Sequence, residues 1–237
     1  MPSLETIGYA IIGGVLPAFI WLYFLLKEDA KHPEPKRLIA IAFFAGMIGV
    51  PFVIPFEELA RAHFVALGFG ATSLPVLTSW AAIEELVKYL LAAAFILWRS
   101  AVDEAPDYVI YMFTVALGFA AAENALFLYA PLSAGQYLLG IETDNLRFVG
   151  STLLHVFASS AIGFALAFSW RKSPLARVVY AAAGLILAVA LHTAFNTLII
   201  WKGGSTALVA FFLVWSAAVV FFALFEILKY FQSRRIV

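Results

Sequence analysis

The amino-acid sequence predicts an all-α, polytopic transmembrane helix bundle of about seven spans. Hydrophobic residues make up 64% of the 237 residues and charged residues only 13%, whereas a soluble domain has about 25% charged residues. Seven apolar segments approach or exceed the roughly 20 residues that cross a bilayer as a helix. No internal repeat or soluble region interrupts them, so we expect one integral membrane domain over residues 1–237.

The connections between the expected spans are short and polar. Pro51 and Pro55 are expected to kink or end the second span, because proline lacks the backbone N–H that a helix interior uses. The longest connections are predicted at 57–73 and 131–147. Glu57 and Glu58 are assigned to the first of them, where they are expected to open an interfacial amphipathic helix that runs through Phe69. The expected spans cover residues 7–26, 38–56, 74–98, 108–130, 148–170, 178–201 and 206–230.

The distribution of Lys and Arg predicts the orientation in a cell membrane. Four of them lie in 27–37, one in 99–107, three in 171–177 and three after residue 228, which places eleven on one side. The other side has only Arg61, Arg147 and Lys202. Because cytoplasmic loops carry the excess of positive charge, the N-terminus is expected outside and the C-terminus in the cytoplasm.

The third span carries charges that a lipid-facing helix avoids. Glu84, Glu85 and Lys88 each cost roughly 2.5–3.5 kcal/mol at the centre of a span. They must therefore face a protein interior or a hydrated cavity. Glu84 and Lys88 are four residues apart and can pair on one helix face. Glu85 points about 100° away and needs another partner.

The next three spans carry further polar groups at a similar depth. With the orientation above, Glu84, Glu123, His155 and His192 all lie roughly 10–15 Å below the outer surface. We therefore expect one polar chamber formed by spans three to six and open to the outside. Other roles remain open: an intramembrane His often makes an interhelical hydrogen bond, and Lys88 can serve as a structural counter-ion.

Carboxylates, imidazoles and an amide in a hydrated membrane cavity suit hydrolysis. A carboxylate held away from water can act as a general base. His192 and Asn196, one helical turn apart, can donate hydrogen bonds to an oxyanion. The same His and Glu groups can instead hold a divalent metal. The sequence contains neither H-E-x-x-H nor G-x-S-x-G.

Four motifs in order resemble the PrsW family of intramembrane proteases, within the superfamily of CAAX-type and Abi endopeptidases. They are E-E-x-x-K at 84–88, F-x-x-x-E-N at 119–124, the isolated His155 and H-x-x-x-N at 192–196, and they span a core of about 74–201. In the CAAX-type branch the first motif ends in Arg and the second in His, whereas Lys88 and Glu123 stand here. Arg147 before the fifth span also fits the PrsW pattern.

The resemblance implies an endopeptidase that cleaves a membrane-anchored, single-pass protein at a first site, as in the processing of anti-sigma factors. By analogy with the CAAX-type branch, the resemblance implies Glu84 as the group that activates water, with His192 and Asn196 as oxyanion donors. The family's mechanism is described both as glutamate-dependent and as metal-dependent, and the spacing of His192 and Asn196 on one helix face favours the route without a cofactor. The catalytic set is then Glu84, Glu85, Glu123, His155, His192 and Asn196, supported by Lys88, Phe119, Asn124 and Arg147.

Three alternatives stay open from the sequence. The first is the same protease with a zinc ion on Glu123, His155 and His192. The second is a proton- or ion-coupled transporter, since intramembrane Glu, Lys and His also form proton relays. The third is a catalytically silent scaffold for single-pass helices. The formal net charge of zero gives no indication of a nucleic-acid partner.

Overall fold

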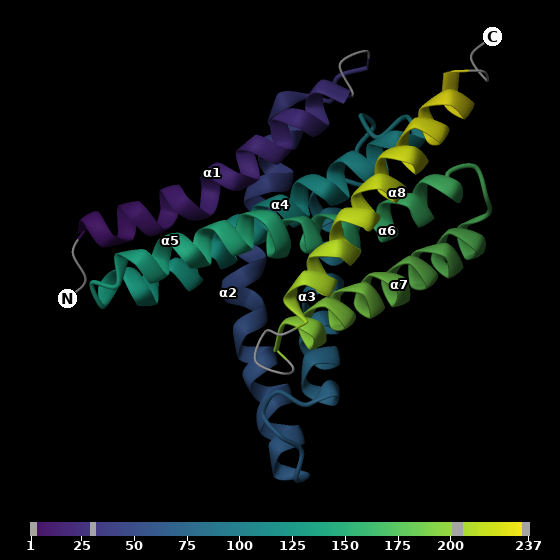
Figure 1. The fold of residues 1–237 in the computed structure, drawn as a ribbon. Coiled ribbons are helices and arrows are strands. Elements are labelled where there is room, and N and C mark those ends of the chain that lie inside the picture. The colour runs from purple at the N-terminus through teal and green to yellow at the C-terminus, as the bar shows by residue number, and fades with distance from the viewer. Residues whose placement is uncertain (1–3, 29–31, 201–205, 234–237) are drawn as a thin grey trace.

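The computed structural model describes residues 4–28, 32–200 and 206–233, and this part of the chain contains helices and no strand. Each of the seven expected spans corresponds to a helix (Figure 1). Five of these helices, α1, α2, α4, α7 and α8, are long and apolar enough to cross a membrane. The helices, with the π-helical turn η1, are α1 Leu4–Glu28, α2 Lys36–Ala66, α3 Leu74–Phe95, α4 Ala105–Ser133, α5 Tyr137–Leu146, η1 Arg147–Ser151, α6 Thr152–Phe168, α7 Pro174–Ile200 and α8 Ala207–Ser233.

The two remaining expected spans are α3 and α6. Helix α6 has 17 residues, fewer than the roughly 20 that a perpendicular span needs. Helix α3 has 22 residues but contains three charged groups, Glu84, Glu85 and Lys88, all of them buried. Lys31, Lys202, Arg234 and Arg235, which enter the charge count, and Trp201, the expected end of the sixth span, lie outside the described residues.

Helix α4 forms the centre of the bundle. Every residue from Ala105 to Ala121 is buried, as expected for a helix that is apolar on all sides. It packs against α1, α2 and α6. Its crossing with α2 is so close that a Cβ on Gly118 would lie 1.9 Å from the carbonyl oxygen of Phe43. Small residues allow such close helix contacts in membranes.

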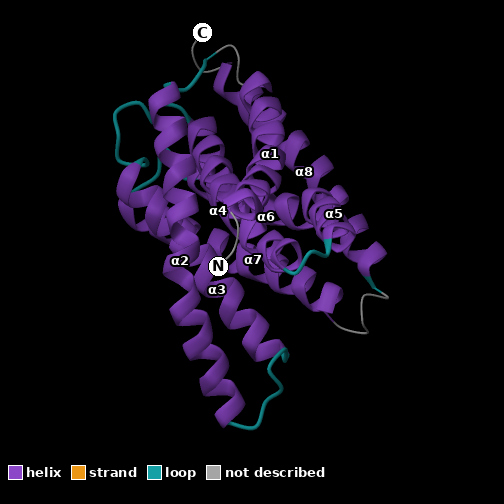
Figure 2. Cartoon of the chain, turned by 90° about the vertical axis from the view of Figure 1, so that its left-hand side faces the viewer, coloured by secondary structure: helices purple, strands orange, loops and turns teal. Residues whose placement is uncertain are grey.

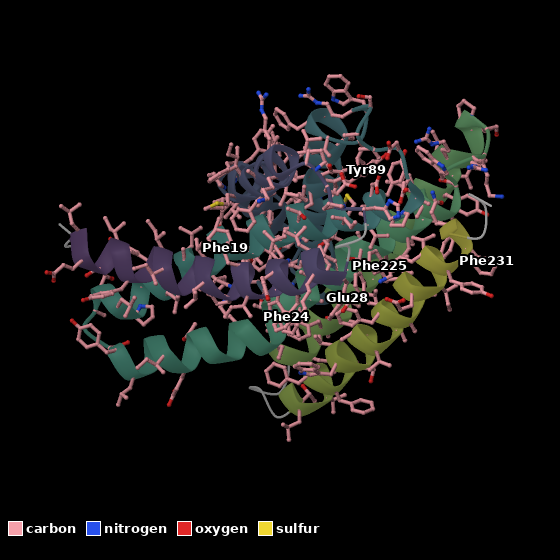
Figure 3. All side chains as sticks on the ribbon, turned by 90° about the horizontal axis from the view of Figure 1, so that it is seen from above. Phe19, Phe24, Glu28, Tyr89, Phe225 and Phe231 are labelled. Atoms are coloured by element: carbon pink, nitrogen blue, oxygen red, sulfur yellow. The ribbon has the colours of Figure 1, made fainter. Side chains whose placement is uncertain are left out.

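The outer surface of the bundle is apolar, which suits contact with lipid. Phe24 on α1 and Phe231 on α8, both labelled in Figure 3, have exposed side chains. Ile12 and Val219 on the same two helices are also exposed. A soluble protein rarely leaves so many large apolar side chains uncovered.

The connection predicted at 57–73 is wrong. Helix α2 continues through Pro51 and Pro55 to Ala66, and Glu57 and Glu58 therefore lie on a helix rather than in a loop. Prolines are tolerated in membrane helices because neighbouring groups satisfy the carbonyls that they leave free. The end of α2, the start of α3 and the loop between them extend below the rest of the bundle in Figures 1 and 2.

The connection predicted at 131–147 is also wrong, because most of it is helical. Helix α4 continues to Ser133, and α5 and η1 follow with only a short turn between. Gly135 in that turn has a φ of 72°, a conformation that glycine adopts without strain. Helix α5 packs on α4 and η1 and exposes Leu138 and Ile141.

Candidate active site

A cavity of about 600 Å³ lies between α2, α3, α4, α7 and the start of α6. It lies toward the end of α7 and the start of α8, which is the outer side in the predicted orientation. Apolar side chains from α2, α4 and α7 form much of its wall. Its polar lining comprises Glu57, Glu58, Trp80, Glu84, Glu123, Arg147, Ser151, His155, His192 and Asn196.

Lys88 pairs with both adjacent carboxylates of α3. Its Nζ donates hydrogen bonds to Glu85 Oε1 at 2.7 Å and to Glu84 Oε2 at 3.3 Å. The ammonium group also lies 4.2 Å from the centre of the Phe119 ring, a cation–π contact. All three charged side chains are buried. The predicted Glu84–Lys88 pair is present, and the pair with Glu85 is shorter.

Glu85 points away from Glu84 on α3 and has further partners on α6 and α7. Ser159 of α6 donates a hydrogen bond to Glu85 Oε2 at 2.6 Å. His192 Nδ1 of α7 lies 2.9 Å from Glu85 Oε1. A carboxylate accepts hydrogen bonds, so His192 carries its proton on Nδ1 and turns Nε2 toward Glu84 Oε1, at 3.9 Å. Glu85 thus links α3 to α6 and α7. It is fully buried and does not belong to the cavity lining.

His155 is fixed between a cation and a carboxylate. Its Nδ1 lies 2.9 Å from Lys88 Nζ, and its Nε2 lies 3.0 Å from Glu123 Oε2. An ammonium group can only donate, so Nδ1 accepts and the proton is on Nε2, which donates to Glu123. His155 Nδ1 also lies 3.7 Å from Glu84 Oε2. The rings of His155 and His192 meet edge to face, 5.0 Å apart.

Arg147 pairs with the carboxylate on the other side of the cavity. It contacts Glu123 and donates through Nε to Asn124 Oδ1. Asn124 in turn donates to Thr152 Oγ1 at 2.9 Å. The predicted supporting residues Asn124 and Arg147 therefore join α4 to the start of α6 and position Glu123. Asn196, one turn after His192, lines the cavity.

The ligand trio that the structure brings together differs from the one expected. Glu84, His155 and His192 offer ligand atoms that all lie within 4.8 Å of one another. Two imidazoles and a carboxylate form a known catalytic zinc set. Each imidazole is held at its other nitrogen by a carboxylate, as metal-ligating histidines usually are. Glu123, expected in the trio, instead contacts Arg147 and the far nitrogen of His155.

Glu57 and Glu58 both line the cavity, although the sequence predicts them in a loop. The signal that identifies Glu57 is helical spacing, because Val50, Val53, Ile54 and Glu57 fall on one face of a continuous α2 and all line the cavity. Trp80 also lines it and donates through Nε1 to the Glu57 carbonyl at 2.9 Å. Phe211 of α8 belongs to the wall as well, and no sequence motif marks it.

Buried carboxylates and imidazoles around a cavity inside an apolar helix bundle define the class: a membrane-embedded enzyme of the hydrolase type. The comparisons with known proteins agree. The family model described as "PrsW family intramembrane metalloprotease" matches residues 34–225, and the chain belongs to this family. The family resemblance seen in the sequence is thus confirmed. No solved structure was found to match the chain.

Curated relatives share most of their length with the chain. "Protease PrsW" of Geobacillus kaustophilus is 28% identical over 198 residues, which cover 81% of this chain and 80% of the relative. "Protease PrsW" of Bacillus subtilis is 25% identical over 189 residues, covering 79% and 82%. That of Clostridioides difficile is 22% identical over 183 residues, covering 77% and 75%. These relatives support an intramembrane protease rather than a transporter.

Proposed function

We propose that the chain is an endopeptidase that hydrolyses a peptide bond of a single-pass, membrane-anchored protein, with water activated by Glu84. The observation that carries this proposal is the position of the Glu84 side chain. It is buried, yet it lines the cavity, and both His155 and His192 turn a nitrogen toward it. Such a carboxylate is sheltered from bulk water and still reaches a water molecule in the cavity.

The hydrolytic step assigns a role to each group. Glu84 accepts a proton from water, and the resulting hydroxide attacks the carbonyl carbon of the substrate. Nε2 of His192, which faces Glu84, takes over that proton, and the imidazolium so formed donates a hydrogen bond, together with Asn196, to the oxyanion that forms. The Glu85 carboxylate balances the charge of that imidazolium through its contact with Nδ1. When the C–N bond breaks, His192 gives the proton back to Glu84, which passes it to the leaving amine.

Zinc is the second candidate route, favoured by the Glu84–His155–His192 trio. These residues have the donor types and spacing that would hold the ion. When bound, zinc would polarise the substrate carbonyl and make water acidic enough to react near neutral pH. However, Lys88 Nζ already donates to His155 Nδ1 and Glu84. An ammonium group thus supplies the positive charge that these two groups need, which favours the glutamate route.

The substrate class follows from the surroundings of the cavity. Leu126, Phe127 and Ile54 line the cavity and have exposed side chains. These apolar side chains suit the entry of a segment held in the bilayer. An anti-sigma-factor-like protein is such a substrate, because a single span holds it in the bilayer. We propose that it is cleaved at its first site, near the outer surface. The family's known substrates and the predicted orientation support this class.

The test replaces Glu84 by Gln in the purified, full-length protein. Glu84→Gln keeps the shape of the side chain and removes the base, so cleavage of a single-pass probe should fall by at least about a thousandfold. Glu142→Gln, on the exposed face of α5, is the matched control and should cleave as the wild type does. Near wild-type cleavage by Glu84→Gln in a folded protein would overturn the proposal.

A further inference from the structure

The cavity has one carboxylate that the hydrolytic step does not use. Glu57 stands on the cavity face of α2, one turn after Val53. The hydrogen bond from Trp80 to its carbonyl holds this level of α2 against α3. The side chain is therefore carried by a helix that is held in place at this level.

The other carboxylates at the site have cationic partners. Lys88 contacts Glu84 and Glu85, Arg147 contacts Glu123, and Arg61 contacts Glu58. In the described residues, 4–28, 32–200 and 206–233, no ion pair or side-chain hydrogen bond reaches the Glu57 carboxylate. Glu84, Glu85 and Glu123 thus face two cations, Lys88 and Arg147, and with neutral imidazoles the cavity keeps an excess of negative charge before Glu57 is counted.

We infer that Glu57 is a specificity-determining residue that binds a Lys or Arg side chain of the substrate close to the cleaved bond. The inference rests on the proposed function. A half-buried carboxylate without a partner is costly, and a cation that enters with the substrate offsets this cost. Val53 and Ile54 on the same face of α2, both in the cavity wall, can hold the aliphatic stem of such a side chain.

The position of Glu57 distinguishes a role in substrate binding from a role in metal binding or in holding the two histidines. Within the part of the chain that the structure describes, Glu57 is not one of the three residues that could hold a metal, and no hydrogen bond from α2 reaches Glu85, His155 or His192. Glu57 also differs from its neighbour Glu58, whose exposed carboxylate pairs with Arg61 on the same helix. Because Glu58 also lines the cavity, the control for Glu57 is taken outside the cavity, at Glu142 on α5.

The experiment uses single-pass probe proteins in liposomes that differ only by Lys, Met or Glu at each position flanking the cleaved bond. The readout is the ratio of kcat/KM for the Lys probe over the Met probe. The wild type should favour Lys by at least about tenfold at one position. Glu57→Gln should bring this ratio close to one, and Glu57→Lys should favour the Glu probe instead. Glu142→Gln, on the exposed face of α5 and outside the cavity lining, should keep the wild-type ratio.

Two outcomes overturn the inference and leave the proposed function intact: a wild type that cleaves all probes equally, or a Glu57→Gln variant that keeps the preference for Lys. Reversal by Glu57→Lys cannot arise from a merely structural role, because loss of packing lowers all rates together. If the wild type cleaves no probe at all, the proposed function fails, and this inference fails with it.

Discussion

Lys88 determines the charge balance of the buried site at the scale of single residues. Its ammonium group contacts Glu84, Glu85 and His155 and lies over the Phe119 ring. No other cation contacts Glu85 among the described residues. Removing the ammonium group would leave two adjacent carboxylates buried without compensation, and this is much more costly than losing an exposed ion pair.

We therefore expect Lys88→Met to lower the free energy of unfolding by about 3–5 kcal/mol. Lys229→Met is the matched control, since Lys229 is part-exposed and pairs with Glu28 and Glu226 near the ends of α1 and α8. It should change stability by less than about 1 kcal/mol. Denaturant titration of both variants in the same detergent measures this. Equal stability of the two variants would show that Lys88 is not the counter-ion of the site.

Most of the candidate site could be predicted from residue types, because charges inside spans have few structural explanations. Glu84, Glu123, His155, His192 and Asn196 all line the cavity. The sequence could not predict which ring nitrogen of His155 or His192 faces which carboxylate. The contacts of His155 with Lys88 and Glu123 depend on the rotation of α6 against α3 and α4, and spacing along one helix does not determine that rotation. The metal trio differs from the expected one for the same reason.

At the scale of helices, the crossing of α2 and α4 holds the two sides of the cavity together. A Cβ on Gly118 would lie 1.9 Å from the Phe43 carbonyl oxygen, and one on Gly46 would lie 2.0 Å from the Val115 carbonyl oxygen. These contacts are with backbone atoms, which cannot move aside as a flexible side chain can. The two helices must therefore separate if either glycine gains a methyl group.

Gly118→Ala should consequently destabilise the protein by about 3 kcal/mol or more. Gly8→Ala on α1 is the control, because nothing lies within 4 Å of the added methyl group. Alanine is the better helix former, so this variant should be neutral or slightly more stable. Thermal unfolding in detergent distinguishes the two. A stable Gly118→Ala protein would contradict the close crossing of α2 and α4.

The helices could be predicted better than the segments that join them. Apolar composition predicts seven of the helices correctly, and five of them are also long and apolar enough to cross a membrane. The wrong prediction at Pro51 and Pro55 applies a rule for helices in water, where a proline in the interior kinks or ends the helix. In a membrane the alternative to a helix is an unsatisfied backbone, so α2 continues and carries Glu57 into the cavity wall. Helix α5 is short, and its packing on α4 leaves no periodic signal.

At the scale of the whole molecule, the charge distribution predicts how the bundle sits in the membrane. Reporters fused after Val237 and in the loop 171–173 should report cytoplasm, and one in the loop 67–73 should report the outside. The cavity lies at the end of the bundle that this orientation places outside. A cytoplasmic signal from the 67–73 loop would reverse the orientation and turn the site toward the cell interior.

The central claim is that Glu84 activates water for peptide-bond hydrolysis in this bundle. Its most direct test is cleavage of a single-pass probe by the purified protein in ¹⁸O-labelled water, with mass spectrometry of both fragments. We expect one ¹⁸O atom in the new carboxyl group, full activity in excess chelator, and no fragments from Glu84→Gln. Cleavage that is lost with chelator and restored by zinc, or that persists in Glu84→Gln, would contradict this account.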